Sequence, residues 1–537
     1  MLRVSYLLLF LLLSYSLVNG QTQVVTGRVT SVSEPGGLPG VNVYMKGTPS
    51  GSITDAEGKF SINAEQGTIL VFSFVGHKSQ EFVYRGQTNI NILLEEDLKE
   101  LNEVVVTGYS SVEKRDITGS VTSIKADDFK EISLNGIDQA LQGQAPGVQV
   151  TQSSGTPGGG ISVRIRGSTS ISASNRPLFV IDGIPVESGS LSLRSFGGQD
   201  DNALSLVNPG DIESIQILKD ASAKAMYGSR AANGVVIIAT KRGKQAQTRI
   251  TFDMQRGIVD PVKKLQMLNS TQLLELQRET VTNAGQNPDA LGLIPGVTDA
   301  VNTDWLDEVF RTGIMQQYQL SASGGDDNTK YYFSGNYRKE EGVQLNNSFE
   351  RFGGAMNIDQ KFNSKLTVKT SMSLSRSLNK RVKGDNFLDG VYSGAIKSLP
   401  FYTPYDENGN IVGPGSPLYA AFPNFNPVGQ ALLPRFNVYT VKLLGSISAI
   451  YNFTDNLNWT SKAGIDYNNV IEDQFESSQT AIGGYLSGVG GQGYGVYSAS
   501  TITNFTANSI LSYSKEINAD HRINALVGTE LLQRPER

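Results

Sequence analysis

The sequence predicts a mainly β protein with an N-terminal β-sandwich, an α+β domain and a long series of alternating strands. Its 537 residues include 57 Gly, 21 Tyr and 22 Phe but only 2 Trp, a composition that favours Gly-rich turns and aromatic strands over helical bundles. Short apolar runs divided by Gly and Pro fill residues 24–95, and longer runs with one apolar and one polar face recur after residue 249. This length is enough for roughly three or four domains.

The composition argues against several classes of function. The formal net charge is only −5, so the chain lacks the basic footprint of a nucleic-acid-binding protein. Cys is absent, which removes disulfides, thiolate metal sites and Cys nucleophiles. His77 and His521 stand far apart, and the acidic pairs at 200–201 and 326–327 fall in predicted loops. We therefore expect no enzyme activity, no catalytic residues, no metal, no cofactor and no nucleic-acid partner.

Residues 1–20 predict a secretory signal peptide. Arg3 precedes an apolar core that begins at Tyr6, and Asn19-Gly20 end the segment. The apolar core is too short for a confident membrane span, although an uncleaved anchor helix is an alternative. No later segment approaches 18 consecutive apolar residues. A further entry into a membrane would therefore require a β-barrel.

Two segments follow, a predicted β-sandwich at 24–95 and a linker at 96–115. The sandwich is indicated by short strands with turn signals at a spacing of about 8 to 12 residues. The linker contains EVVVTGY at 103–109. Its three Val residues have high β propensity and no local partner, so the segment can add an edge strand to another protein's sheet. From spacing alone, an ordinary strand of a flanking domain is an equally good explanation.

Residues 116–243 predict a small α+β domain that ends in a strand, helix and strand. Apolar residues at 212–218 predict a buried strand, Asp220 is a candidate N-cap for a helix at 221–227, and residues 235–239 predict another strand.

Earlier parts of the same domain show three further patterns. Ser133 can cap a helix that ends near residue 145. Arg164 and Arg166 share one strand face, which is either solvated or packed against a polar wall. Asp182-Gly183 lies between two apolar runs and favours a hairpin turn.

Residues 249–537 alternate between apolar and polar positions. The pattern is clearest at 366–375 and 457–468. It recurs near 315–323, 331–338, 441–453 and 505–513. Strands of about ten residues with one apolar and one polar face are required by an outer-membrane barrel. The alternative is a set of soluble sandwiches, whose strands are usually shorter.

The connections in this region alternate in length. Those at 363–364 and 454–456 are tight, whereas those at 379–438 and 472–500 are long and rich in Gly, Pro or aromatic residues. Short periplasmic turns and long external loops produce this asymmetry in barrels. The Leu-rich segment 265–282 predicts a helix inside the first long connection.

The order of these segments resembles the SusC/RagA-like branch of TonB-dependent outer-membrane receptors. The motifs that carry the resemblance are EVVVTGY at 103–109, APGVQV at 145–150, VRIRG at 163–167, PLFVIDGIPV at 177–186 and LKDASAKAMYGSRAANGVVIIATKRG at 218–243. Residues 24–95 resemble the carboxypeptidase-regulatory-like domain through GRV at 27–29, LPGVNV at 38–43, TDAEGKF at 54–60 and LVFSFVG at 70–76. That resemblance implies a seven-stranded accessory sandwich without peptidase chemistry.

The resemblance implies roles for particular residues. A TonB box would be formed by Glu103, Val104, Val105, Val106, Thr107, Gly108 and Tyr109. The TonB energy-transducing complex would pair with Val104 to Val106 by strand addition and pull on a plug domain at 116–243. Structural or gating roles in the plug would belong to Arg164, Arg166, Gly167, Asp182, Gly183, Asp220, Tyr227, Gly228, Arg230, Asn233 and Gly234. Arg164 and Arg166 would face carboxylates on the barrel wall.

The resemblance also implies a location, partners and a ligand. The barrel would lie in outer-membrane lipid, with the sandwich and the TonB box in the periplasm and a SusD-like surface lipoprotein as a lid. The imported ligand would be an oligosaccharide or a peptide. Barrels of this kind have 22 strands, and residues 249–537 account for about nine strands of about ten residues plus loops, so we expect the N-terminal part of a longer receptor. The alternative function is that of a secreted multidomain adhesion or binding protein without transport.

Overall fold

The computed structural model contains two units, Met1–Val104 and Val105–Arg537. It describes residues 23–31, 34, 36–46, 48, 51–74, 77–95, 104–107, 110–113, 121–171, 174–194, 199–220, 225–287, 300–384, 387, 389–413, 425–480, 482–486, 492–518 and 521–534. The predicted signal peptide at 1–20 lies outside these residues.

The first unit is a β-sandwich, as the sequence predicts. One sheet has the order β4-β1-β7 and the other the order β3-β2-β5-β6. The strands are β1 Gln23–Ser31, β2 Asn42–Met45, β3 Gly51–Ile53, β4 Lys59–Ala64, β5 Ile69–Ser73, β6 Gln80–Val83 and β7 Asn89–Leu94. Every second residue of β4 and β7 is buried, because one face of each strand is turned towards the opposite sheet. Phe60 and Phe72 meet edge to face in the core, with ring centroids 5.3 Å apart.

The plug domain at the start of the second unit is built on a five-stranded sheet of order β10-β15-β16-β13-β14, with a separate hairpin β11-β12. The strands are β10 Val121–Lys125, β11 Val148–Gln152, β12 Ile161–Ile165, β13 Leu178–Ile181, β14 Ile184–Val186, β15 Ile212–Leu218 and β16 Val235–Thr240. The inner strands β15 and β16 are mostly buried, which explains the apolar run Val235 to Ala239 and the apolar residues at 212, 215, 217 and 218.

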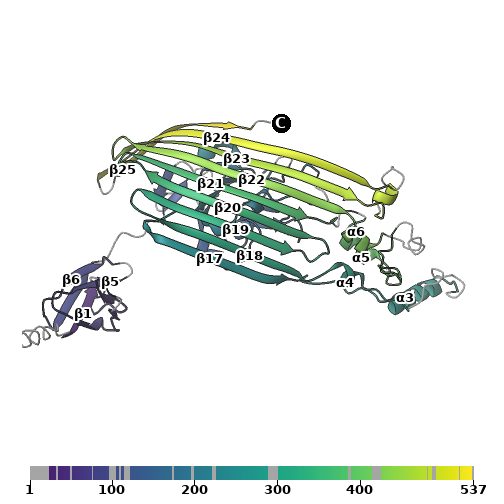
Figure 1. Ribbon diagram of the computed structural model, residues 1–537, viewed down its shortest axis with the longest axis horizontal. Helices are drawn as coiled ribbons and strands as arrows, with labels where there is room; N and C mark the ends of the chain where they lie inside the picture. The colour runs from purple at the N-terminus through teal and green to yellow at the C-terminus, as the bar shows by residue number, and fades with distance from the viewer. Residues whose placement is uncertain are drawn as a thin grey trace, which may run out of the picture. The chain divides into compact units, whose positions relative to one another are not determined.

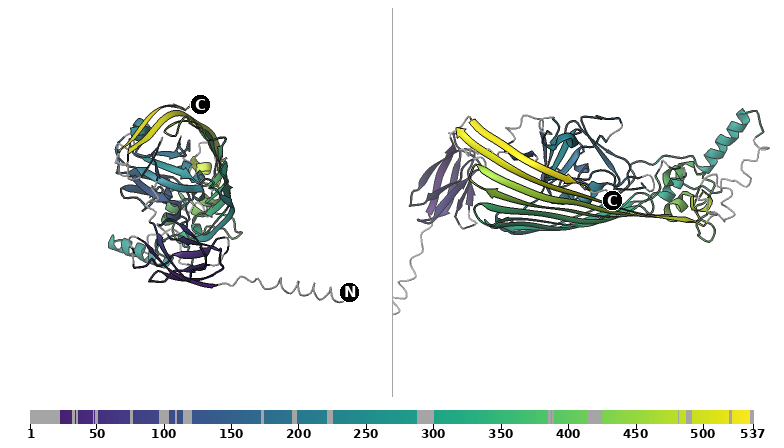
Figure 2. Two further views of the ribbon diagram at one scale, coloured as in Figure 1. Left: turned by 90° about the vertical axis from the view of Figure 1, so that its left-hand side faces the viewer. Right: turned by 90° about the horizontal axis from the view of Figure 1, so that it is seen from above.

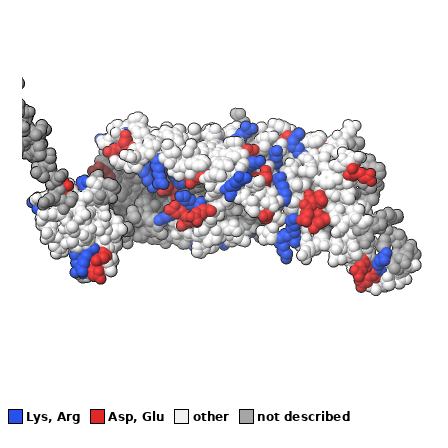
Figure 3. Space-filling view, turned by 60° about the horizontal axis from the view of Figure 1, so that its bottom comes forward, with Lys and Arg blue, Asp and Glu red and all other residues white. Residues whose placement is uncertain are grey.

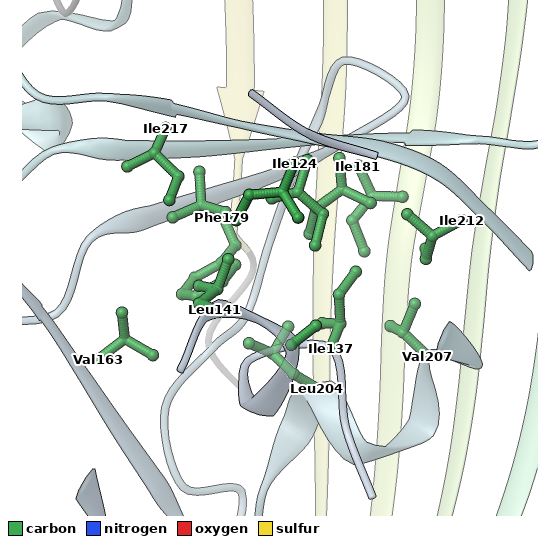
Figure 4. Packing of buried hydrophobic residues seen from close by; sticks show 14 of the residues in the cluster. Ile124, Ile137, Leu141, Val163, Phe179, Ile181, Leu204, Val207, Ile212 and Ile217 are labelled. Atoms are coloured by element: carbon green, nitrogen blue, oxygen red, sulfur yellow. The ribbon is translucent and has the colours of Figure 1, made fainter. Parts of the chain in front are cut away.

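The core of the plug domain lies between this sheet and the segments that cross it. In Figure 4, Ile124, Phe179 and Ile181 from the strands point towards Ile137, Leu141 and Leu204 from the crossing segments. Burial of each such side chain stabilises the fold by about 1.5–3 kcal/mol relative to exposure.

The predicted hairpin at Asp182-Gly183 is confirmed. It joins the antiparallel strands β13 and β14, and both turn residues have positive φ, 46° and 80°. Two such residues in succession form the mirror-image turn that matches the twist of a hairpin.

One helix expected in the plug domain is replaced by a short 3₁₀ turn, and the second has 3₁₀ geometry over its described residues. After Ser133 the chain forms only η3, Gln139–Leu141, capped by the carboxylate of Asp138. Gly143, within the predicted helix, has a positive φ of 74°, which an α-helix excludes. At the second position, residues 221–224 lie outside the described part. The 3₁₀ segment η7, Ala225–Ala231, is interrupted at Gly228, where φ is 62°. The remaining 3₁₀ turns are η2 Ala126–Asp128, η5 Ala203–Leu206 and η6 Pro209–Asp211.

The rest of the second unit is one antiparallel sheet of nine strands in sequence order. The strands are β17 Ala246–Val259, β18 Gly313–Gly325, β19 Thr329–Glu341, β20 Ser348–Lys361, β21 Leu366–Lys380, β22 Arg435–Asn452, β23 Leu457–Glu476, β24 Tyr494–Asn518 and β25 His521–Gln533. Figure 2 shows this sheet curved around the plug domain. The expected part-barrel of about nine strands is confirmed, and the alternative of separate soluble sandwiches is wrong, because the strands form a single sheet.

The two faces of the nine-stranded sheet differ as the alternation predicts. On β21, Met372 and Leu374 are 43% and 51% exposed, whereas Ser375 is 4% exposed. On β23, Asp466 and Asn468 are fully buried. The apolar side chains therefore point outward, and the polar side chains point towards the plug domain.

Long connections gather at one end of the sheet (Figure 1). They contain α3 Ser270–Asn283, α4 Trp305–Val309, α5 Val391–Lys397, α6 Pro427–Leu432 and the π-helix η9 Ile482–Leu486. Helix α3 overlaps the predicted helical segment 265–282 but begins five residues later and ends one residue later. Helices α4, α5 and α6 share a core around Trp305, Val391 and Val428. Within the described part of the chain, no helix combines the length and the hydropathy needed to span a bilayer.

Candidate functional site

The predicted TonB box coincides with a short strand. Val104–Thr107 form β8, which pairs with β9, Ser110–Glu113. Among the described strands, β8 has no other neighbour. Glu103, Gly108 and Tyr109 lie outside the described residues, so the assignment of the TonB box stays a prediction.

Three buried arginines on the polar face of the sheet contact the plug domain. Arg338, Arg351 and Arg381 come from β19, from β20 and from the residue after β21, and each is at most 2% exposed. Arg351 donates hydrogen bonds to the carbonyl of Ser205 at 2.6 Å and to Oδ1 of Asn208 at 3.1 Å. Burying a guanidinium is costly unless it is hydrogen-bonded. The two terminal nitrogens of Arg351 meet this need through the plug, while its Nε has no partner among the described residues, so these contacts tie the position of the plug to the sheet.

The other two arginines make similar contacts. Arg381 donates to the carbonyl of Gln199 at 2.8 Å and forms an ion pair with Asp201. Burial raises the pKa of the Asp201 carboxyl, and the Arg381 charge opposes that shift. Arg338 contacts Asn135 of the plug and the neighbouring carboxylate Glu340 on its own strand, the latter at 2.7 Å.

The hairpin turn of the plug is a second anchoring point. The Asp182 carboxylate accepts hydrogen bonds from Thr240 Oγ1 at 2.6 Å and from Ser371 Oγ of β21 at 2.8 Å. Lys462 of β23 donates to the carbonyl of Asp182 at 2.8 Å. The turn is thereby held both by the last strand of the plug and by two strands of the sheet.

Glycines permit close approach at the same interface. A Cβ added to Gly464 of β23 would lie 2.2 Å from Cδ1 of Ile184, and one added to Gly183 would lie 2.6 Å from Nζ of Lys462. A Cβ on Gly158 would meet the Phe349 ring at 2.4 Å. These distances are shorter than any van der Waals contact, so a larger residue at any of the three positions would displace the neighbouring side chain or the plug.

The expected contacts of Arg164 and Arg166 with the wall are not found in the described part of the barrel, and that expectation is wrong for these strands. Arg166 instead forms an ion pair with Asp220 inside the plug, and Arg164 is exposed. Arg166 has a positive φ of 59° and Gly167 one of 97°, so the chain turns at the end of β12 and directs Arg166 back to its own domain. The buried arginines at the interface come from the sheet.

The remaining plug residues named from the sequence have structural contacts. Tyr227 is buried in a core cluster, and Arg230 forms an ion pair with Glu530 of β25. Asn233 donates to the carbonyl of Ser174 at 2.7 Å. Gly234 has a φ of 101° and packs against Ile165.

Sequence reasoning missed the interface residues of the sheet. Arg338, Arg351 and Lys462 occupy inward positions of alternating strands, where most neighbours are uncharged. The sequence did contain a signal for these residues: they are charged and lie at positions that the alternation assigns to the polar face. A charge on that face needs a partner in the lumen, so it indicates a contact with the plug. Figure 3 shows that on one face of the molecule Lys and Arg are interspersed with Asp and Glu in small groups.

A sheet with an apolar outward face and a domain on its polar face defines a class, the outer-membrane receptors that carry a plug. The comparisons agree with this class. The family described as TonB-dependent Receptor Plug Domain matches residues 113–235, and the CarboxypepD_reg-like domain family matches residues 25–106.

Individual relatives narrow the class. The chain is 34% identical over 536 residues to TonB-dependent receptor P3 of Formosa agariphila, covering 98% of this chain and 49% of the relative. It is 39% identical over 325 residues to TonB-dependent receptor SusC of Bacteroides thetaiotaomicron, covering 60% and 31%. The RagAB peptide importer in its open-open state superposes with a TM-score of 0.66 at 26% identity, covering 80% of this chain and 49% of that chain.

The chain is therefore homologous to the TonB-dependent receptors of the SusC and RagA type, and the resemblance seen in the sequence is confirmed. These homologues are receptors and transporters of the outer membrane rather than enzymes. The chain spans about half the length of the curated relatives it matches.

Proposed function

We propose that the full-length protein actively imports a large nutrient across the outer membrane and that a TonB partner opens it by pulling on residues 103–109. The observation that carries this proposal is that polar contacts join the plug to the sheet. They are made by Arg351, by Arg381 and by the Asp182 turn. Groups joined by hydrogen bonds and ion pairs can exchange these partners for water when they separate. These polar contacts can therefore be broken and replaced by water when the plug moves.

The coupling site would be the strand β8. A TonB partner would add its own strand to Val104–Thr107 and form main-chain hydrogen bonds. In this arrangement the sandwich and the TonB box lie in the periplasm, and the short turns of the sheet lie on the periplasmic side of the membrane. The long connections with α3 to α6 then face the outside.

The ligand would be an oligosaccharide or a peptide, and a SusD-like surface lipoprotein would cover the external mouth. The RagAB neighbours, described as a peptide importer, support a large ligand of this kind. The ligand-contacting residues would lie on the long connections and on the parts of the plug beneath them.

A deletion of residues 103–109 in the full-length protein tests the coupling. We expect ligand binding to stay unchanged and energised uptake to fall to the level of cells without TonB, because the plug is intact but nothing can pull it. Uptake of labelled ligand and binding to isolated outer membranes measure the two quantities.

A deletion of the same length at 96–102 is the matched control, since it shortens the linker equally and keeps EVVVTGY. It should retain more uptake than the first deletion. Normal uptake after loss of 103–109 would contradict the proposal, as would equal loss in both deletions.

A further inference from the structure

The outward face of the nine-stranded sheet has two unusual rows of side chains. The register of β18 to β22 aligns five residues in one row: Tyr318, Tyr337, Phe352, Arg376 and Val441. The next row, two residues closer to the short turns, holds Leu320, Gly335, Gly354, Leu374 and Leu443. Phe352 and Leu374 are 55% and 51% exposed, which places both rows on the face turned away from the plug.

The second row contains a hollow. Gly335 and Gly354 pair directly across β19 and β20, so two neighbouring outward positions lack a side chain. A Cβ added to Gly335 would meet nothing within 4 Å. The hollow has a volume of about 470 Å³, and its lining comprises Ser334, residues 352–356, Met372, Leu374 and Arg376. The lining is therefore mostly apolar, and Arg376 is its one charged residue.

The position of Arg376 corresponds to a membrane boundary. It lies ten residues along β21 from Leu366, a height of about 25 Å at roughly 3.3 Å per residue and a tilt of about 40°. The apolar band of an outer-membrane barrel is also about 25 Å tall. Tyr337 stacks near Phe352 and Tyr318, with ring centroids 4.6 and 6.3 Å apart, as in the aromatic girdle that marks such a boundary.

Arg376 has no carboxylate partner among the described residues. Glu350, diagonal to it across β20 and β21, accepts a hydrogen bond from the Tyr337 hydroxyl at 2.9 Å instead. A guanidinium binds phosphate through two parallel hydrogen bonds, and an apolar hollow directly beneath it suits a hydrocarbon chain. Both parts of this arrangement match one amphiphilic molecule.

We propose that this surface binds one anionic, phosphate-bearing lipid of the leaflet on the side of the long connections. The phosphate pairs with Arg376, and one acyl chain fills the hollow over Gly354, beside its cross-strand partner Gly335. This site goes beyond the proposed import function, because it uses only the membrane placement of the sheet and neither the plug nor the TonB box.

Native mass spectrometry of the delipidated full-length protein tests the site. The probes are dimyristoylphosphatidylglycerol, dimyristoylphosphatidylcholine with the same chains, and glycerol phosphate as a head group without chains. We expect one retained phosphatidylglycerol, bound about tenfold more tightly than phosphatidylcholine, and no displacement by glycerol phosphate. Equal retention of the two lipids, or displacement by glycerol phosphate, would overturn the proposal. This test needs no variant of the protein.

Two variants separate the parts of the site. Arg376→Gln removes the charge, and Gly335→Leu adds bulk beside the hollow, at a position where an added Cβ meets nothing within 4 Å. Each should weaken phosphatidylglycerol binding about tenfold. The matched controls are Arg435→Gln, an outward arginine paired with Asp473, and Ala449→Leu, which adds bulk elsewhere on the outward face. Unchanged binding in both test variants, or equal loss in the controls, would also overturn the proposal.

Discussion

At the scale of single residues, the ion pair between Arg381 and Asp201 shows how the plug is held. Both side chains are buried, at 1% and 8% exposure, and they belong to the sheet and to the plug respectively. A buried charge that loses its partner destabilises a protein by about 3–5 kcal/mol, whereas removing both charges can be nearly neutral. The pair therefore contributes more to the position of the plug than to its net stability.

A double-mutant cycle tests this interpretation. We expect Arg381→Met to destabilise the seated plug by about 3–5 kcal/mol and Arg381→Met combined with Asp201→Asn to recover most of that loss. Urea titration of the full-length protein, followed by hydrogen exchange of plug amides, measures both. If the two substitutions were additive, the pair would not be coupled.

Asp138 is a second residue with a measurable effect. Burial raises the pKa of its carboxyl to about 6, and a hydrogen bond from Asn202 partly opposes the shift. Its ordinary pKa is about 3.9, so between about pH 4 and pH 6 the folded plug binds more protons at this site than the unfolded plug. Stability contributed by this group is then present at low pH and is lost as the pH rises through 6.

Asp138→Asn should therefore flatten the decline in plug stability between pH 4 and 6 and should stabilise the plug at pH 7 by roughly 2–3 kcal/mol at most. Hydrogen exchange of the plug amides, measured between pH 4 and 6, gives the slope of plug stability against pH. Asp127→Asn, an exposed carboxylate of the same domain, is the control and should leave the slope unchanged. An unchanged slope in Asp138→Asn would contradict the assignment.

At the scale of elements, the contact between the hairpin β13-β14 and β23 depends on one missing side chain. Gly464 leaves room for Ile184, whose Cδ1 would lie 2.2 Å from an added Cβ. Gly464→Val should destabilise the seated hairpin by about 1–3 kcal/mol, the usual cost of overpacking, and should increase passage of solutes too large for porins.

The neighbouring strand provides a matched control. A Cβ added to Gly445 would lie 3.5 Å from Ile465 Cγ2, an ordinary contact, and would point outward. Gly445→Val should therefore change neither the stability of the contact between the hairpin and β23 nor the passage of large solutes. Equal sensitivity of the two variants to a large antibiotic would show that the hairpin contact does not seal the lumen.

Elements with local signals could be predicted from the sequence, and elements without them could not. The Asp182-Gly183 turn, the strands β21 and β23 and helix α3 follow from turn residues and periodicity over a few neighbours. The helix predicted after Ser133 is absent apart from the short turn η3, and Gly143 within its predicted range has a positive φ that helical periodicity does not reveal. The contacts between the plug and the sheet could not be predicted for a different reason. Arg351 and Asn208, for example, are 143 positions apart, and no local pattern specifies such a pair.

At the scale of the whole molecule, the question is whether the hairpin leaves the sheet during transport. The polar contacts of Asp182 and the fit of Ile184 against Gly464 hold the hairpin in the closed state. The 537 residues contain no Cys. Two introduced Cys residues can therefore form no disulfide within this sequence except the one between them. A Cβ added to Gly464 would lie 2.7 Å from Cγ1 of Ile184, so the side chains of two introduced Cys residues would be neighbours, as a disulfide requires.

The double variant Gly464→Cys with Ile184→Cys should lock the hairpin to β23. We expect the oxidised full-length protein to bind ligand but not to import it, and we expect a reductant to restore uptake, because the covalent link prevents only the movement of the plug. Ile184→Cys alone controls for the lost apolar side chain and should import equally with and without the reductant. If the oxidised double variant imported ligand normally, the hairpin would stay seated during transport, and the path would have to open between the sheet and another part of the plug.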